Sequence, residues 1–193
     1  KTLSQAFNSA SFILFDHYQT VVQQSPEEIM AWIDAGANYN TFQLPQLATD
    51  LASLKQGQAI NNPITGETIK ATPIIFFETL FGYAHQATGQ YIGQLIWLDT
   101  PLDVAFARTI KSSNLQMFNH INNPQFSKEA ITDVKKHCEW MDNYINNYIQ
   151  FVSKTLHIQQ QQVRPTANIQ IFATNNTEDI HAKAYQFIQD NIS

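Results

Sequence analysis

The stretch Pro73-Ile-Ile-Phe-Phe-Glu78 decides the fold, because it is a short apolar run that ends in a carboxylate. A run of this length is typical of a strand buried on both faces of a parallel sheet. A glutamate can end such a strand where its charge emerges at the carboxyl edge of the sheet, which is where α/β folds bind ligands. The alternative is a strand that simply continues into a polar loop.

Further apolar runs alternate with helical patterns along the chain. We expect strands at Phe12-Ile-Leu-Phe-Asp16, 92–99 and 169–173, and a short hairpin around Pro63-Ile-Thr-Gly66. Helices are expected to begin near Ser25, Leu44, Thr100, Ser127 and either Asn176 or Thr177. Ser25 and Glu28 have the pattern of a capping box, and residues 114–126 are ambiguous. Strands and helices that alternate at this spacing predict an α/β protein with one domain over residues 1–193.

The expected architecture is a three-layer α/β/α sandwich around a mainly parallel five-stranded sheet, as in P-loop NTPases. Four of its strands are visible in the sequence. The segment Lys1-Thr-Leu-Ser-Gln-Ala-Phe7 has the pattern of the first turns of a helix. We therefore expect the first strand and a glycine loop to lie before residue 1.

Composition limits the function classes. The net charge is −5 at neutral pH, which gives no support for a nucleic-acid or anionic-membrane partner. The single cysteine, Cys138, excludes an intrachain disulfide framework and favours a reducing compartment. No apolar run reaches the roughly 20 residues that a membrane span needs. We expect a cytoplasmic protein without nucleic-acid or membrane partners, and a homo-oligomer is compatible with the sequence.

Lys1-Thr2 corresponds to the end of the phosphate-binding motif G-x-x-x-x-G-K-S/T. In that motif, the lysine contacts the terminal phosphates and the hydroxyl binds Mg²⁺. The alternative is a solvated lysine with no ligand.

Asp16-His17-Tyr18 follows a strand directly, so Asp16 can accept the proton of a substrate hydroxyl. The alternative is an aspartate that caps the following turn. Glu78 can bind Mg²⁺ through water or hold the substrate. His85 lies in a glycine-containing loop, where a surface role is the alternative to a binding role.

Arg108 lies on the helix that follows the third carboxylate-ended strand, which suggests a clamp on phosphate. The alternative is a salt bridge with Asp99 or Asp103.

Five stretches in the right order resemble the uridine kinase/phosphoribulokinase family of P-loop kinases, including the short nicotinamide riboside kinase type. Lys1-Thr-Leu-Ser4 is similar to the end of G-K-S/T-T-L, and Phe12-Ile-Leu-Phe-Asp-His-Tyr18 to the strand that ends in D-D-F/Y. Residues 37–57 resemble N-F/Y/W-D-x-P followed by L-x-x-L-x-x-G. Ile74-Ile-Phe-Phe-Glu78 with Gly82 resembles I-I-V/L-E-G, and residues 98–111 resemble D-x-x-x-D-x-x-x-x-R-R-I-K-R-D.

The resemblance implies phosphorylation of a hydroxyl on a small molecule such as a nucleoside, riboside or sugar, with ATP and Mg²⁺. It implies that Lys1 and Thr2 bind the nucleotide, with Thr2 and Glu78 near the metal. Asp16 would activate the hydroxyl, and Arg108 would belong to a lid over residues 108–126. The substrate-side candidates are His17, Tyr18, Tyr39 and His85.

The lid departs from the family pattern. Thr109 stands in place of its second arginine, and Ser112-Ser113 in place of its R-D pair. Since arginine stabilises charge on the transferring phosphoryl group, the departures favour an alternative function. That alternative is a nucleotide-binding regulatory or interaction protein of the same fold, with little or no kinase activity.

Overall fold

The structure is a computed structural model that describes residues 7, 10–18, 24–122, 130–173 and 177–191. Lys1 and Thr2 lie outside the described residues, as do the expected first helix up to residue 6 and the expected helix start at Ser127. Contacts divide the chain into two compact units. The first comprises residues 1–99 with 158–193 and the second residues 100–157, and each is described by itself.

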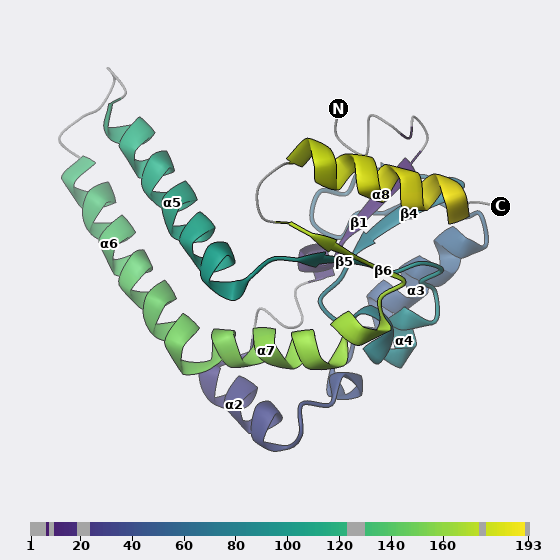
Figure 1. Cartoon of the computed structure of the whole chain (residues 1–193), viewed down its shortest axis with the longest axis horizontal. Helices are drawn as coiled ribbons and strands as arrows, with labels where there is room; N and C mark the ends of the chain where they lie inside the picture. Colours follow the sequence, from purple (N-terminus) through teal and green to yellow (C-terminus); the bar gives the residue numbers. More distant parts are fainter. Residues whose placement is uncertain (1–6, 8–9, 19–23, 123–129, 174–176, 192–193) are drawn as a thin grey trace. The chain divides into compact units, whose positions relative to one another are not determined.

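The first unit holds all the strands of the described part of the chain (Figure 1). Strand β1 (Ala10–Leu14) pairs with β4 (Ile74–Glu78), and β5 (Ile96–Asp99) pairs with β6 (Ile169–Phe172). Both pairs are parallel, whereas β2 (Ile60–Asn61) and β3 (Thr68–Ile69) form the expected antiparallel hairpin. The fold is therefore mixed α/β with small parallel sheets, as predicted, but the described strands do not form one five-stranded sheet.

Two strand predictions need correction. β1 ends at Leu14, and Asp16 lies instead in the 3₁₀ turn η1 (Phe15–Tyr18) that follows it. β5 begins only at Ile96 because the residues from Tyr91 to Leu95 form a turn and an irregular segment. The shorter strands still end at or just before a carboxylate.

The helices of the first unit begin and end where local chemistry favours it. Helix α2 (Pro26–Asp34) starts with the predicted capping box, in which the Ser25 hydroxyl accepts from the Glu28 amide and the Glu28 carboxylate accepts from the Ser25 amide. It ends before Gly36, whose φ of 95° favours glycine. The other helices are α3 (Pro45–Lys55), α4 (Gln86–Gly89) and α8 (Thr177–Asn191).

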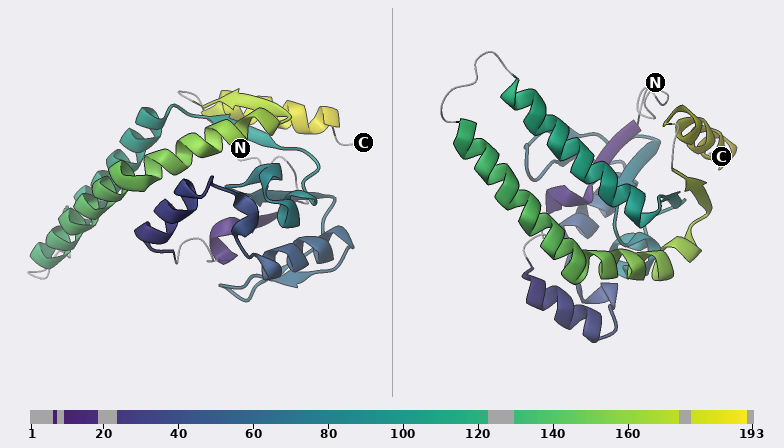
Figure 2. Two further views of the ribbon diagram at one scale, coloured as in Figure 1. Left: turned by 90° about the horizontal axis from the view of Figure 1, so that it is seen from below. Right: turned by 60° about the vertical axis from the view of Figure 1, so that its left-hand side comes forward.

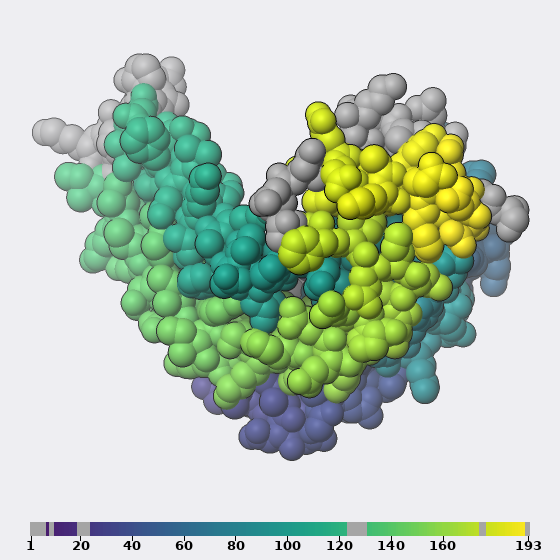
Figure 3. Space-filling model, viewed as in Figure 1, coloured from purple at the N-terminus to yellow at the C-terminus, as the bar shows by residue number. Residues whose placement is uncertain are grey.

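Helices cover the strands on two sides. Figure 2 shows α8 on one side of the strands and α3 on the other. In the space-filling view of Figure 3, α8 (yellow) lies at the surface of the molecule. On the α3 side, Ile75 and Phe77 of β4 pack against the core. The aromatic centre of that core is Phe81, whose ring stacks on Phe42 at 5.2 Å and meets Phe15 edge-on at 5.1 Å.

The second unit is helical. Helix α5 (Leu102–Ile121) includes residues 114–121 of the segment 114–126 that the sequence left ambiguous. Helix α6 (Ala130–Asn147) continues through a π-helical turn (Tyr148–Val152) into α7 (Ser153–Gln162). Phe106 and Tyr148 join α5 to this turn, with ring centroids 4.4 Å apart. The expected lid region falls within this unit. In the described part of the chain, no helix combines the length and apolarity that crossing a bilayer requires.

Candidate active site

The parallel pairing of β1 and β4 brings two carboxylates to one place. Leu14 lies opposite Glu78 in the ladder, so β1 and β4 end side by side. The 3₁₀ turn after Leu14 then carries Asp16 and His17 to the same edge, where both act electrostatically on Glu78. Asp16 and Glu78 therefore lie at the carboxyl end of the strands, which is the edge that the sequence predicted for their charges.

The Glu78 carboxyl group has a raised pKa. Partial burial is the main cause, and the negative charge of Asp16 adds to it. A hydrogen bond from the Phe15 backbone and the charge of protonated His17 lower the pKa of Glu78. These two effects are smaller than burial and the charge of Asp16, so the pKa is raised on balance. Glu78 holds a proton more readily than an isolated glutamate, while Asp16 is exposed to solvent.

The hairpin fixes the tautomer of His17. The side-chain oxygen of Asn62 accepts from the amides of Ile64 and Thr65, at 2.9 and 3.1 Å, which identifies the other amide atom as nitrogen. That nitrogen lies 2.8 Å from His17 Nδ1, so it donates and Nδ1 accepts. The neutral ring therefore carries its proton on Nε2, and Nδ1 is not free for a ligand.

This arrangement suits proton transfer from a hydroxyl or the binding of a hard cation. Mg²⁺ in phosphoryl-transfer sites is usually held by one or two carboxylates, with water and phosphate completing its shell. Asp16 and Glu78 are the carboxylates that could hold it here. Among the described residues no group of three or more metal-binding side chains occurs, so phosphate and water would supply the remaining ligands.

Tyr18 is bound to a buried carboxylate. Its hydroxyl donates to Asp50 at 2.8 Å, and Gln46 donates to the other oxygen of Asp50, also at 2.8 Å. Asp50 is 6% exposed. Burial and this hydrogen bond raise the pKa of Tyr18. In the structure the Tyr18 hydroxyl anchors η1 to α3, and its predicted contact with substrate is untested.

Tyr39 and His85 lie in the core. Tyr39 packs against Trp32 and Phe81, and burial raises its pKa to about 12. His85 is 2% exposed, with Nδ1 2.8 Å from the Thr88 hydroxyl and Nε2 3.1 Å from the Phe42 carbonyl. Because that carbonyl can only accept, Nε2 donates and Nδ1 accepts. Both nitrogens are engaged, so we assign His85 a structural role, and the surface alternative is wrong.

The structure does not place the remaining predicted residues relative to the site. Lys1 and Thr2 lie outside the described residues. Arg108 lies on α5 in the second unit, and the two units are described separately. The expected contacts of these residues with a nucleotide therefore stay predictions.

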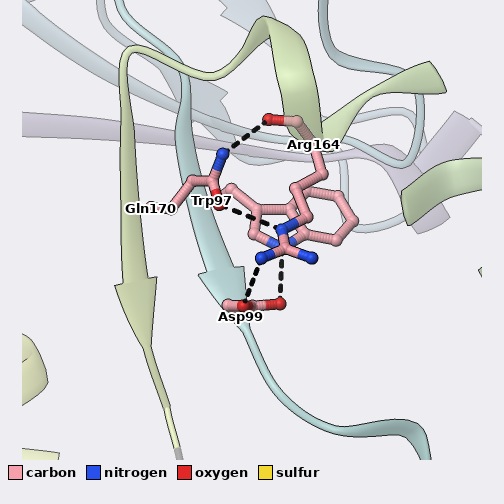
Figure 4. A network of polar contacts seen from close by, with 4 residues as sticks. All are labelled: Trp97, Asp99, Arg164 and Gln170. Atoms are coloured by element: carbon pink, nitrogen blue, oxygen red, sulfur yellow. Dashed lines mark hydrogen bonds and ion pairs between the residues drawn. The ribbon is translucent and has the colours of Figure 1, made fainter. Parts of the chain in front are cut away.

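Arg164 is a residue that the sequence did not reveal. It pairs with Asp99 at the end of β5, with 3.0 Å between guanidinium nitrogen and carboxylate oxygen (Figure 4). Trp97 donates to the other Asp99 oxygen at 3.2 Å, and Arg164 also donates to Gln170 at 3.0 Å. Asp99 is therefore held by both Arg164 and Trp97. The only sequence signal was an arginine shortly before the strand that pairs with β5.

Comparison with known proteins adds no relative. The sequence matches no model of a protein family, and no curated protein matches it. The Asp16–Glu78 site and the motifs in the sequence are therefore the features that bear on function.

Proposed function

We propose that the protein is an ATP-dependent kinase that transfers the γ-phosphoryl group to a hydroxyl of a small molecule, of the nucleoside, riboside or sugar type. The observation that carries the proposal is the carboxylate pair of Asp16 and Glu78 at the carboxyl ends of parallel strands, with the pKa of Glu78 raised. Phosphoryl transfer needs a group that accepts or orients the hydroxyl proton and a metal that neutralises phosphate charge.

Each residue of the pair has a distinct role in this proposal. Asp16 is exposed, so it can reach a bound hydroxyl and accept its proton. Glu78 supplies an oxygen toward Mg²⁺ or the acceptor. His17, held by Asn62, leaves its Nε2–H as a donor for the acceptor molecule. Lys1 and Thr2 would contact the phosphates, and ATP would supply the transferred group.

The proposed fold is a P-loop sandwich with a five-stranded sheet. The two parallel pairs and the helices on either side support this architecture, which requires one strand more than the four parallel strands described. We propose that Arg108 belongs to a lid on the second unit, which would exclude water during transfer.

The second candidate is a nucleotide-binding regulatory protein of the same fold. The lid composition favours it, because Thr109 replaces an arginine of the family pattern. The Thr109 hydroxyl is 3.2 Å from the Ala105 carbonyl one turn earlier, so it donates within its own helix. It offers no positive charge to a phosphoryl group.

Acceptor-dependent release of ADP tests the proposal. The full-length protein is incubated with Mg-ATP and a panel of nucleosides, ribosides and sugar phosphates, beside Asp16→Asn and the control Asp34→Asn. Asp34 is an exposed carboxylate at the end of α2. Stimulation by one acceptor that is lost only in Asp16→Asn supports the kinase. ATP binding without any stimulation supports the regulatory protein instead.

A further inference from the structure

Helix α6 packs on α5 through one of its faces. His137 Nε2 lies 3.2 Å from the side-chain oxygen of Asn114 on α5. The ring of Tyr144 stacks on Phe106 of α5, with centroids 6.0 Å apart. His137 and Tyr144 are seven residues, or about two helical turns, apart, so they mark the side of α6 that faces α5. Figure 1 shows the two helices side by side within the second unit.

A line of apolar side chains runs along a different face of α6. They recur at spacings of three and four residues, which is the pattern of the core positions of a coiled coil. The α6 stripe, as we name it, consists of Ile131, Val134, Cys138, Met141 and Ile145. Cys138 and Ile145 each directly follow a residue that faces α5, which turns them about 100° away from that side. Ile131 is 79% exposed and Cys138 is exposed, so α5 leaves much of the stripe open.

Two opposite charges stand along one side of the α6 stripe. Lys135 and Asp142 each follow the second apolar residue of a repeat, so they are seven residues apart and share a side. Lys135 Nζ lies 3.8 Å from Glu139, and both side chains are largely exposed. Asp142 accepts from Asn146 at 3.1 Å. Such surface contacts within one helix are weak, so both charges are available to a partner at little cost.

We propose that the α6 stripe is the surface through which two copies of this chain associate, with their α6 helices antiparallel. In an antiparallel pair, the two kinds of core position meet each other, so Val134 packs against Ile145 of the second copy. The same register sets Lys135 of each copy beside Asp142 of the other. A two-fold axis repeats every contact, so this ion pair forms twice.

The charge pattern selects this arrangement over others. Parallel helices would place Lys135 and Asp142 of one copy on the side away from the same residues of the second copy, and the pairing would be lost. A membrane surface is also disfavoured, because α6 carries two lysines against three acidic residues and lacks the basic excess of helices that lie on anionic lipid. A helix of another protein would need no such self-complementary charges.

The expected association is weak. Five apolar side chains in each copy make a small interface, in the class below about 1,200 Å² of buried surface. The dimer should therefore form and dissociate with protein concentration. The inference does not depend on the proposed kinase activity, because α6 carries none of the residues assigned to that activity.

Charge reversal tests the inference. Sedimentation of the full-length protein over roughly 1 μM to 1 mM measures its dimer dissociation constant. Lys135→Asp makes both ion pairs repulsive and is expected to raise this constant about tenfold. Lys135→Asp combined with Asp142→Lys restores the attraction and should return the constant to within about threefold of the original.

Lys136→Asp is the matched control for this measurement. Its side chain is 71% exposed beside that of Lys135, which is 77% exposed, but it points away from the α6 stripe and contacts Asp133 of its own helix. The same charge reversal there should leave the dissociation constant nearly unchanged. A monomer at every concentration would overturn the inference. A dimer that tolerates Lys135→Asp, or a loss that the double reversal does not rescue, would also overturn it.

Disulfide trapping tests the antiparallel register. Two proteins that both carry Cys138→Ala are prepared, one with Val134→Cys and the other with Ile145→Cys, and they are mixed and oxidised mildly. The antiparallel register predicts that the mixed dimer exceeds both dimers of like chains at least about tenfold, because a disulfide needs its Cα atoms within roughly 7 Å. Like chains joined preferentially would indicate parallel helices and overturn the inference. Circular dichroism of each variant checks that the monomer stays folded.

Discussion

Asp16 and Glu78 meet beside the carboxyl ends of two paired strands, where partial burial and then the charge of Asp16 raise the pKa of Glu78. Two carboxylates that repel each other in this way favour a state in which one of them holds a proton or both share a cation. The relationship depends on the register that sets Leu14 opposite Glu78. A shift of one residue would turn Glu78 to the other face of the sheet.

Replacing Asp16 by asparagine is expected to lower the pKa of Glu78 toward its ordinary value of 4.5, because a like charge is removed. The burial contribution remains, so the return is incomplete. Carboxyl ¹³C shifts of Glu78 followed by NMR across pH measure the change, with Asp34→Asn as control. An identical titration of Glu78 in Asp16→Asn would show that the two carboxylates do not interact.

The same raised pKa has a consequence for stability. The folded protein favours protonated Glu78, so this group stabilises the fold below pH 4.5 and loses that contribution as pH rises through the folded pKa. The Glu78→Gln variant has no carboxyl group to titrate at this position. The free energy of unfolding of the variant, relative to that of the unchanged protein, should therefore increase as pH rises from 4.5 through the folded pKa of Glu78. Since much of the Glu78 side chain stays open to solvent despite this partial burial, the expected gain is under about 1 kcal/mol. Urea unfolding at several pH values measures it.

His17 is expected to change tautomer when its hairpin partner is changed. Asn62 donates to Nδ1, so ¹⁵N shifts of the ring should report the Nε2–H form. Asn62→Asp replaces the donor by an acceptor, and a proton should then appear on Nδ1. Thr68→Ser, a change elsewhere in the hairpin, is the control. An unchanged tautomer in Asn62→Asp would mean that the contact does not set the state of the ring.

The bond between Tyr18 and Asp50 is expected to contribute to stability. Tyr18→Phe leaves one oxygen of a 6%-exposed carboxylate without its donor, which should cost about 1–3 kcal/mol. Tyr185→Phe is the control, because its hydroxyl accepts from the exposed Gln189 and its loss should cost under about 0.5 kcal/mol. Equal losses in urea unfolding would contradict the structural role of Tyr18.

Asp99 and Arg164 are expected to be coupled more strongly than an ordinary surface pair. Their side chains are 19% and 41% exposed, whereas those of Glu139 and Lys135 are 60% and 77% exposed. Double-mutant cycles with alanine should give about 1 kcal/mol for the first pair and under about 0.5 kcal/mol for the second. No difference between the cycles would place Arg164 among weak surface contacts.

Strands and caps were predictable because their signals are local. The Pro73–Glu78 run gave a strand within one residue of the observed one, and Ser25 with Glu28 gave a capping box that the structure confirms. The end of β1 was less predictable, because an apolar residue such as Phe15 can be buried equally well by a strand or by a 3₁₀ turn.

The contacts of the site were predictable only in part. Asp16 and Glu78 could be placed together because parallel strands share an edge. The partners of the site lie far away in the sequence. Asn62 is 45 residues from His17, Asp50 is 32 residues from Tyr18, and Arg164 is 65 residues from Asp99. No local pattern encodes such contacts. The surface alternative for His85 was wrong because the glycine-containing sequence around it is typical of a loop. Its hydrogen bond to the distant Phe42 carbonyl, beside the one to Thr88, is visible only in the folded structure.

Detection of the phosphorylated acceptor by mass spectrometry tests the central claim most directly. The full-length protein and its Asp16→Asn variant are incubated with Mg-ATP and the acceptor panel, and nucleotide affinity is measured in parallel. The account predicts a product carrying one added phosphoryl group, formed roughly 100-fold more slowly by Asp16→Asn at similar nucleotide affinity. A folded protein that binds ATP yet phosphorylates no acceptor, or an Asp16→Asn variant as active as the unchanged protein, would contradict it.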